Sequence, residues 1–256
     1  FLNAANLTTQ INHIEQERLH KVSPKLMTKR RGAGEVTSKR IIDRLIRQQN
    51  FLTNVHTFPL NRFCGSLSGV RTPQAAEQIL SDFGINRSTM WGYKTKGAAL
   101  DYLVARIEAR QINISRGVLS NKLVPTWNVV PSDVYRNTSG FAIKDNRVPF
   151  IFIPSELNPD EMEGRQIYTL VYLLVVIGLD QYAFFLDKDF RAKALSAQGV
   201  ERRIHQITAE ILMPTVELEK LRGQDITPVL RDEYAKKFKV SPSALVLTLR
   251  MRGIIN

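Results

Sequence analysis

Cysteine is almost absent from this chain of 256 residues, which carries Cys64 alone. A single thiol excludes a disulfide within the chain and fits a reducing, cytoplasmic setting. The sequence offers Cys64 no clear base that would activate it. We therefore expect a small, buried or half-buried residue at this position.

Long hydrophobic runs are missing as well. The longest apolar stretch, Ile167–Leu179, is bounded by Gln166 and Asp180 and is too short to span a bilayer. No secretory signal is visible. The stretch predicts a buried helix, and we expect no contact with a membrane.

The common motifs of metal, nucleotide and nucleophile sites are not found. None of the four histidines pairs with another at helical ligand spacing, and no Ser-His-Asp arrangement or phosphate-binding loop is present. Gly32-Ala33-Gly34 lacks the strand–turn–helix context of a nucleotide site and is interpreted as flexible chain. Glu201 and His205 share a helix face, where a surface pair or a helix-packing contact is favoured over a metal site. The sequence predicts no catalytic residue, metal or cofactor.

Acidic residues are scarce in the first half of the chain. Residues 1–120 hold 18 Lys/Arg and 8 Asp/Glu, a balance of +10, whereas residues 121–256 hold 18 and 16, a balance of +2. This asymmetry indicates a polyanionic partner, with a solvated basic surface as the alternative. The aromatic residues that single-strand binders interleave are absent from the basic region itself. The predicted nucleic-acid-binding residues are Lys25, Lys29, Arg30, Arg31, Lys39, Arg40, Arg44 and Arg47.

Hydrophobic periodicity, prolines and glycines predict an α+β fold. Residues 21–38 are expected to be a break, and Ser38 to cap a helix whose apolar stripe is Ile41, Ile42, Leu45 and Ile46. Thr72 is the expected N-cap of a helix that ends at Gly84. The other expected helices are 1–20, 96–110, 163–179, 199–212, 232–238 and 241–250, and the expected strands are 112–114, 140–143 and 148–154, the last two forming a hairpin.

Four segments of the second half follow one another in a characteristic order. They are Ser139–Ile143, Pro149–Ile153, Glu201–Pro214 (ERRIHQITAEILMP) and Tyr234–Ile255 (YAKKFKVSPSALVLTLRMRGII). In these segments the chain resembles the ImmA/IrrE family of zinc peptidases over residues 97–256. The resemblance implies a zincin-like, mixed helical domain with a small β-sheet over residues 70–256, preceded by a helical, basic extension over residues 1–69.

The catalytic motif of that family is missing from the corresponding helix. Catalysis in the family needs His-Glu-x-x-His, in which two histidines hold zinc and the glutamate activates the bound water. The equivalent positions here are Tyr172, Leu173 and Val176, which offer neither good zinc ligands nor a base. Glu201 alone matches the family's third, carboxylate ligand. The resemblance therefore implies a pseudo-peptidase whose former cleft is either open or filled.

The resemblance also implies a role. Active members of the family cleave helix-turn-helix repressors, so we expect a non-enzymatic regulator of phage or mobile-element origin that binds a repressor or another regulator protein. The alternative is direct DNA binding by the basic half and by Tyr234–Arg252, which has helix-turn-helix spacing but few polar groups to read bases. A different enzyme site is a weaker alternative, since Arg165, Asp180 and Glu201 form no recognisable acid–base pair. A homo-oligomer is left open.

Overall fold

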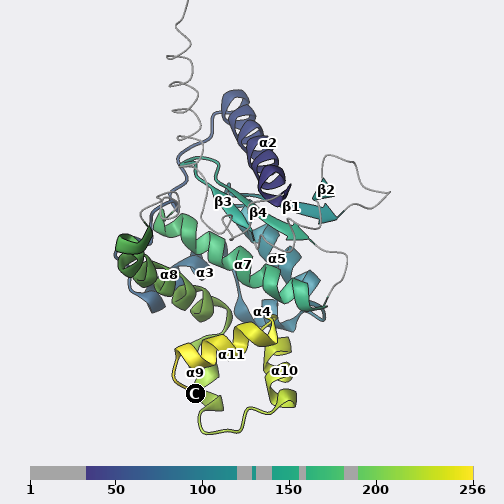
Figure 1. Ribbon diagram of the computed structural model, residues 1–256, viewed down its shortest axis with the longest axis vertical. Coiled ribbons are helices and arrows are strands. Elements are labelled where there is room, and N and C mark those ends of the chain that lie inside the picture. Colours follow the sequence, from purple (N-terminus) through teal and green to yellow (C-terminus); the bar gives the residue numbers. More distant parts are fainter. Residues whose placement is uncertain (1–32, 120–128, 131–139, 156–159, 182–189, 256) are drawn as a thin grey trace, which may run out of the picture.

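The computed structural model describes residues 33–119, 129–130, 140–155, 160–181 and 190–255 (Figure 1). The described part is mostly helical with one small sheet, which confirms the α+β prediction. Its elements are α2 (Ala33–Val55), α3 (Thr72–Phe83), α4 (Arg87–Gly92), α5 (Lys96–Glu108), β1 (Asn113–Leu119), β2 (Val129–Val130), β3 (Phe141–Ile143), β4 (Phe150–Ser155), α7 (Asp160–Leu179), α8 (Phe190–Leu212), α9 (Thr215–Leu218), the 3-10 helix η3 (Glu219–Leu221), α10 (Pro228–Lys237) and α11 (Pro242–Met251).

The sheet has the strand order β2-β1-β4-β3. Strand β1 pairs in parallel with β4 and, through two residues, with β2, whereas β3 and β4 are antiparallel. The predicted hairpin is thus confirmed, and its turn is closed by Asp145 Oδ1, which accepts from the backbone N of Arg147 and of Val148 at 2.7 and 2.8 Å. Strand β1 was expected only over residues 112–114, because Ser115, Arg116 and Gly117 interrupt the apolar pattern. In the structure it extends to Leu119.

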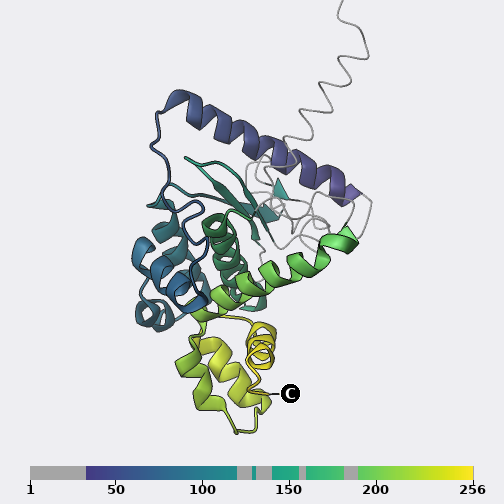
Figure 2. The same ribbon diagram turned by 90° about the vertical axis from the view of Figure 1, so that its left-hand side faces the viewer.

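Helix α7 covers one face of the sheet and α2 covers the other (Figures 1 and 2). The stripe of Ile41, Ile42, Leu45 and Ile46 on α2 packs on Phe141, Ile143, Phe150 and neighbouring apolar residues, as its spacing predicted. Gln49 fixes the contact, since its Nε2 donates to the backbone O of Val148 at 2.8 Å. The domain boundary expected at residue 70 stays a prediction. Helix α2, which precedes that boundary, shares a hydrophobic cluster with strands β3 and β4, which follow it.

The start of α2 differs from the expectation. The helix begins at Ala33, so the predicted break is wrong over residues 33–38 and the interpretation of Gly34 as flexible chain is wrong too. The helix expected over residues 1–20 lies outside the described residues.

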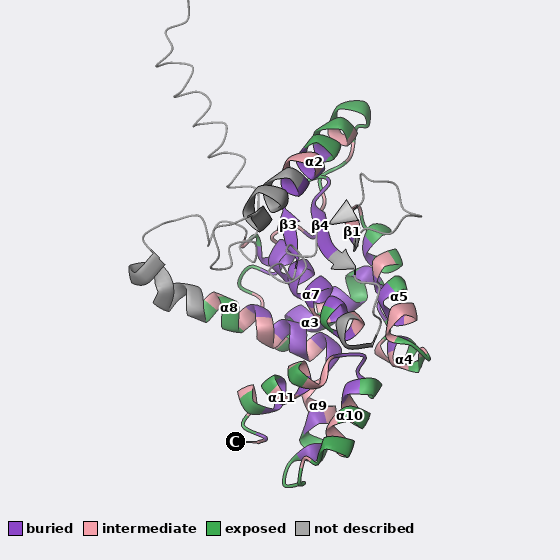
Figure 3. Cartoon of the chain, turned by 45° about the vertical axis from the view of Figure 1, so that its right-hand side comes forward, coloured by how far each residue is buried: buried purple, intermediate pink, exposed green. Residues whose placement is uncertain are grey.

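Helix α7 is the centre of the main core, and its middle is buried on all sides (Figure 3). It packs on α5, α8 and the sheet. Two glycines permit close approach: a Cβ on Gly164 would lie 2.6 Å from the carbonyl carbon of Val240, and one on Gly178 would lie 2.5 Å from Leu67 Cδ1. The buried helix expected from the apolar run is confirmed. No helix in the described part of the chain is long and apolar enough to cross a membrane.

The remaining helix boundaries differ in detail from those expected. Arg71, not Thr72, is the N-cap of α3, while Gly84 ends this helix in the left-handed region as predicted. Helix α8 begins at Phe190, nine residues before the expected Gly199. Helix α4 was not expected, although Asn86 caps it by accepting from Thr89 N at 2.9 Å. Helix α11 follows the expectation.

Candidate functional site

Helix α7 turns Tyr172, Leu173 and Val176, the positions compared with the zinc motif in the sequence, into the core. Tyr172 and Val176 each keep 1% of their surface exposed and Leu173 keeps none. All three belong to the main hydrophobic cluster. Burying an aliphatic side chain of this size stabilises a fold by about 1.5–3 kcal/mol. These positions therefore contribute to packing, and Leu173 and Val176 have no donor atom to offer a metal.

Helix α8 supplies His205, whose ring faces two tyrosines of α7. Its Nδ1 is hydrogen bonded to the Oη of Tyr168 at 2.9 Å. The His205 ring lies 4.9 Å from the Tyr172 ring, centroid to centroid. Its Nε2 lies 3.8 Å from Oε1 of Glu201. The expectation was a surface pair or a helix-packing contact: His205 packs against two α7 tyrosines, and the exposed Glu201 pairs with His205 on its own helix.

Electrostatics keep both tyrosines in the neutral form. Burial raises the pKa of Tyr168 to about 12. The pKa of Tyr172 is raised further, first by burial and then by the negative charge of Glu201 and by Tyr168. A phenol that keeps its proton is a poor metal ligand. Among the residues that the structure describes, no group of three or more His, Cys, Asp or Glu side chains is arranged to hold a metal ion.

The predicted nucleic-acid-binding residues are only partly within the described chain. Arg44 and Arg47 lie one helical turn apart on α2, with their side chains described. Lys39 and Arg40 belong to α2 by their backbone alone. The other four, which lie outside the described residues, are Lys25, Lys29, Arg30 and Arg31.

Arg44 and Arg47 line a pocket between α2 and strand β1. We call it the arginine pocket; its volume is about 650 Å³. Its wall is mixed, with cationic, neutral polar and apolar side chains. The lining residues are Arg44, Arg47, Gln48, Phe51, Leu52, Asn113, Ile114, Ser115, Arg116 and Phe150.

The positive charges of the arginine pocket are only partly neutralised. Arg116 forms an ion pair with Asp101 at 2.7 Å. Within the described part of the chain, neither Arg44 nor Arg47 forms an ion pair, and Nε of Arg44 is buried with no acceptor in reach. Burial lowers the pKa of the Arg44 guanidinium, because partial desolvation disfavours its charge. An anion in the pocket would meet two cations that have no counter-charge among the described residues.

Two members of the arginine pocket were missed by the sequence reasoning. Phe51 lies one turn after Arg47 on α2 and is 65% exposed. Its i, i+4 spacing from Arg47 was a usable signal, because such residues are neighbours on a helix surface. Arg116 gave no such signal, since its approach to α2 depends on how the sheet and the helix pack.

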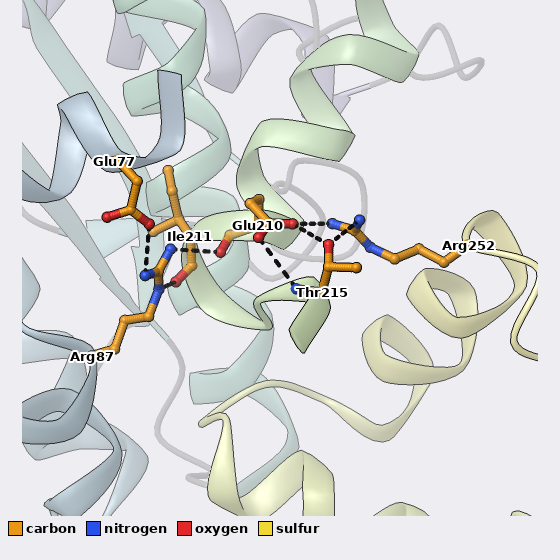
Figure 4. A network of polar contacts seen from close by, with 6 residues as sticks. All are labelled: Glu77, Arg87, Glu210, Ile211, Thr215 and Arg252. Carbon is orange, nitrogen blue, oxygen red and sulfur yellow. Dashed lines mark hydrogen bonds and ion pairs between the residues drawn. The ribbon is translucent and has the colours of Figure 1, made fainter. Parts of the chain in front are cut away.

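The segment Glu201–Pro214, which carries part of the resemblance, ends in a structural network (Figure 4). Oε2 of Glu210 accepts from Thr215 Oγ1 and from Nη2 of Arg252, each at 2.6 Å. Arg87 donates to the backbone O of Glu210 and of Ile211, each at 3.0 Å. These contacts tie α4 and the chain after α11 to the C-terminal end of α8. The acidic side chain of this motif therefore has a structural role.

The segment with helix-turn-helix spacing forms α10 and α11. Two of its basic residues are engaged in the fold: Lys237 pairs with Glu217 at 2.6 Å and lies 5.8 Å from the Trp91 ring, and Lys239 is buried in the turn. The surface of α11 includes the apolar Leu247, which is half exposed. This geometry favours a structural closing element.

Among the described residues, two of the side chains named for the weaker enzymatic alternative have other partners. Asp180 pairs with Lys144 at 2.7 Å, whereas Glu201 lies beside His205. Cys64 is half-buried, as expected, and burial together with the Asp180 charge raises the pKa of its thiol to about 11. No thiolate nucleophile is available near neutral pH.

Comparison with known proteins gives no further guidance: no family model matches the chain, and no curated protein or solved structure matches it at a significant level. The function must therefore be argued from the α7–α8 contact and the arginine pocket.

Proposed function

We propose that this protein is a catalytically inactive, zincin-like relative of the ImmA/IrrE peptidases that acts by binding a regulator without cleaving it. The observation that carries the proposal is the position of Tyr172, Leu173 and Val176 in the core, where the family would hold zinc and its base. The proposal is supported by Tyr172, whose raised pKa keeps its phenol neutral and whose ring lies 4.9 Å from the His205 ring, because a neutral phenol is a poor zinc ligand.

The class of partner in this proposal comes from the family resemblance. Active members act on helix-turn-helix repressors of mobile elements, so the proposed partner is a repressor or another regulator protein in the cytoplasm. Loss of the catalytic groups leaves a protein that holds such a partner and changes its availability for DNA.

The proposal is tested by mixing the purified protein with candidate repressors, with and without added zinc. We expect a complex that survives gel filtration and a repressor that stays intact on a denaturing gel. Cleavage that a chelator abolishes would refute the claim of inactivity. An intact repressor with no complex would refute the binding role.

A second candidate function is direct binding of nucleic acid. It is favoured by Arg44 and Arg47, which the fold places together at one pocket without a described counter-charge. Phosphate contacts by such residues make affinity fall steeply as salt rises. A salt titration tests it: we expect binding that weakens with salt, and no binding at low salt removes this candidate.

A further inference from the structure

The arginine pocket combines a cationic wall with an exposed aromatic ring, and this combination specifies a class of ligand. We propose that it binds a nucleoside phosphate unit, presented as an unpaired nucleotide of a single-stranded nucleic acid. The inference deepens the second candidate function and rests on it. It is independent of whether the α7–α8 region is catalytically inactive.

The phosphate is assigned to Arg44 and Arg47. Both line the pocket from the same face of α2, and neither has an ion-pair partner among the described residues. Arg44 also has a buried Nε without an acceptor in that part of the chain. An unsatisfied buried donor carries a desolvation cost that a phosphate oxygen would relieve. A guanidinium fork matches two phosphate oxygens at once, which strengthens the contact.

The base is assigned to the neighbouring part of the pocket. Phe51 follows Arg47 by one helical turn and is 65% exposed, so most of its ring is available for contact at the edge of the pocket. Base stacking on such a ring tolerates any sequence because every base has a π-face. Asn113 and Ser115 on the β1 side add polar groups that can meet a base edge.

The ligand is inferred to be unpaired because of where the ring lies. In a duplex the bases are already stacked on one another, so Phe51 would gain nothing from them, and only phosphates would reach the arginines. A single strand offers both groups from one nucleotide.

Nucleic acid is favoured over an acidic peptide by charge. Carboxylates also pair with arginine, but the balance of +10 over residues 1–120 extends well beyond one pocket and suits a long polyanion. The exposed ring beside the cations adds stacking, which acidic side chains do not use.

The test is fluorescence anisotropy with the full chain and a labelled oligothymidylate of about 12 nucleotides, a length typical of single-strand sites. A duplex of equal length is the second probe. Adenosine 5′-monophosphate and a polyglutamate peptide are competitors. The variants are Phe51→Ala and the double variant Arg44→Gln/Arg47→Gln. The charge-matched control is Lys94→Gln/Arg202→Gln, which removes two exposed cations from other elements.

We expect Phe51→Ala to weaken single-strand binding about tenfold and to leave duplex binding within twofold. The double arginine variant should weaken single-strand binding at least about tenfold and lower the salt slope by about 1, while the control changes affinity less than threefold. If adenosine 5′-monophosphate displaces the oligonucleotide at concentrations close to the Kd of the oligonucleotide, the ligand of the pocket is a free nucleotide. If it does not, the ligand is a nucleotide within a single strand.

Three results would overturn the inference. If both pocket variants bind single strands within twofold of the parent, nucleic acid is bound elsewhere, and the second candidate function survives without this site. If neither the single strand nor the duplex binds at low salt, the pocket inference and the second candidate function are both refuted. If polyglutamate displaces the oligonucleotide at a lower concentration than unlabelled oligonucleotide does, the pocket takes an acidic protein segment. Phe51 is exposed and Arg47 lies on the surface, so their single variants keep the test valid if the double variant does not fold.

Discussion

The α7–α8 contact and the arginine pocket both gather side chains that are capable of chemistry, but they differ in how those groups are satisfied. At α7–α8, the buried Tyr172 and the half-buried Tyr168 and His205 contact one another. In the arginine pocket, Arg44 and Arg47 have no counter-charge in the described chain, and Phe51 is exposed. In the first region the polar groups contact one another, whereas in the second two cations lack a counter-charge among the described residues.

This difference indicates which region contributes to the stability of the fold and which is available for binding. Buried groups that satisfy one another contribute to the free energy of folding and have little left to offer a partner. Exposed cations and rings contribute little to folding and remain available to a partner. A resemblance directs attention to the helix where a family performs catalysis, but in this chain the available groups lie on the opposite face of the sheet.

The largest expected effect is on folding, at Tyr172. We expect Tyr172→Ala to lower the free energy of unfolding by about 3–5 kcal/mol, because it leaves a cavity in the core. Phe51→Ala should change it by no more than about 0.5 kcal/mol, since that ring is mostly exposed. Urea denaturation of the two variants measures the contrast. Equal losses would contradict the division between a packed region and a binding region.

A smaller effect distinguishes paired from unpaired arginines. Arg252→Ala should cost about 1–3 kcal/mol, because it leaves the largely buried carboxylate of Glu210 without its cation. Arg47→Ala should leave stability nearly unchanged, since no described ion pair is lost. The same denaturation experiment decides, and a destabilised Arg47→Ala would show that this arginine holds the fold together.

The smallest effect is expected in alkaline solution. An unfolded tyrosine loses its proton near pH 10, whereas burial raises the pKa of Tyr168 to about 12 in the folded protein. Between these values the folded state holds the extra proton, so stability falls as pH rises. Tyr168→Phe should make this fall shallower by up to about 1.4 kcal/mol per pH unit. Identical slopes for parent and variant would show that Tyr168 ionises normally, and hence that the α7–α8 contact is open to water.

The sequence was sufficient for the elements with strong periodicity. The stripe of α2, the apolar run of α7 and the capped start of α11 were predictable because burial and capping impose local patterns. The start of α2 was not, since the glycine at 34 suggested a break, and neither was the length of β1, where Arg116 and Gly117 interrupt the apolar pattern.

The candidate sites were predictable only in part. That Tyr172 and Val176 are poor zinc ligands could be stated from the sequence, but the packing of His205 against two tyrosines depends on how α7 and α8 meet. Arg44 and Arg47 were predicted as cations. Their union with Phe51 and Arg116 at one pocket depends on the packing of α2 across the sheet, which no local pattern encodes.

The most direct test of the central claim is the zinc content of the purified protein after equilibration with zinc and gel filtration. A filled α7–α8 contact predicts no stoichiometric zinc, with Glu201→Gln indistinguishable from the parent and from Glu233→Gln, a control at an exposed acidic residue of α10. One zinc per chain that is lost in Glu201→Gln and kept in Glu233→Gln would contradict the claim and restore a metal site at this helix pair.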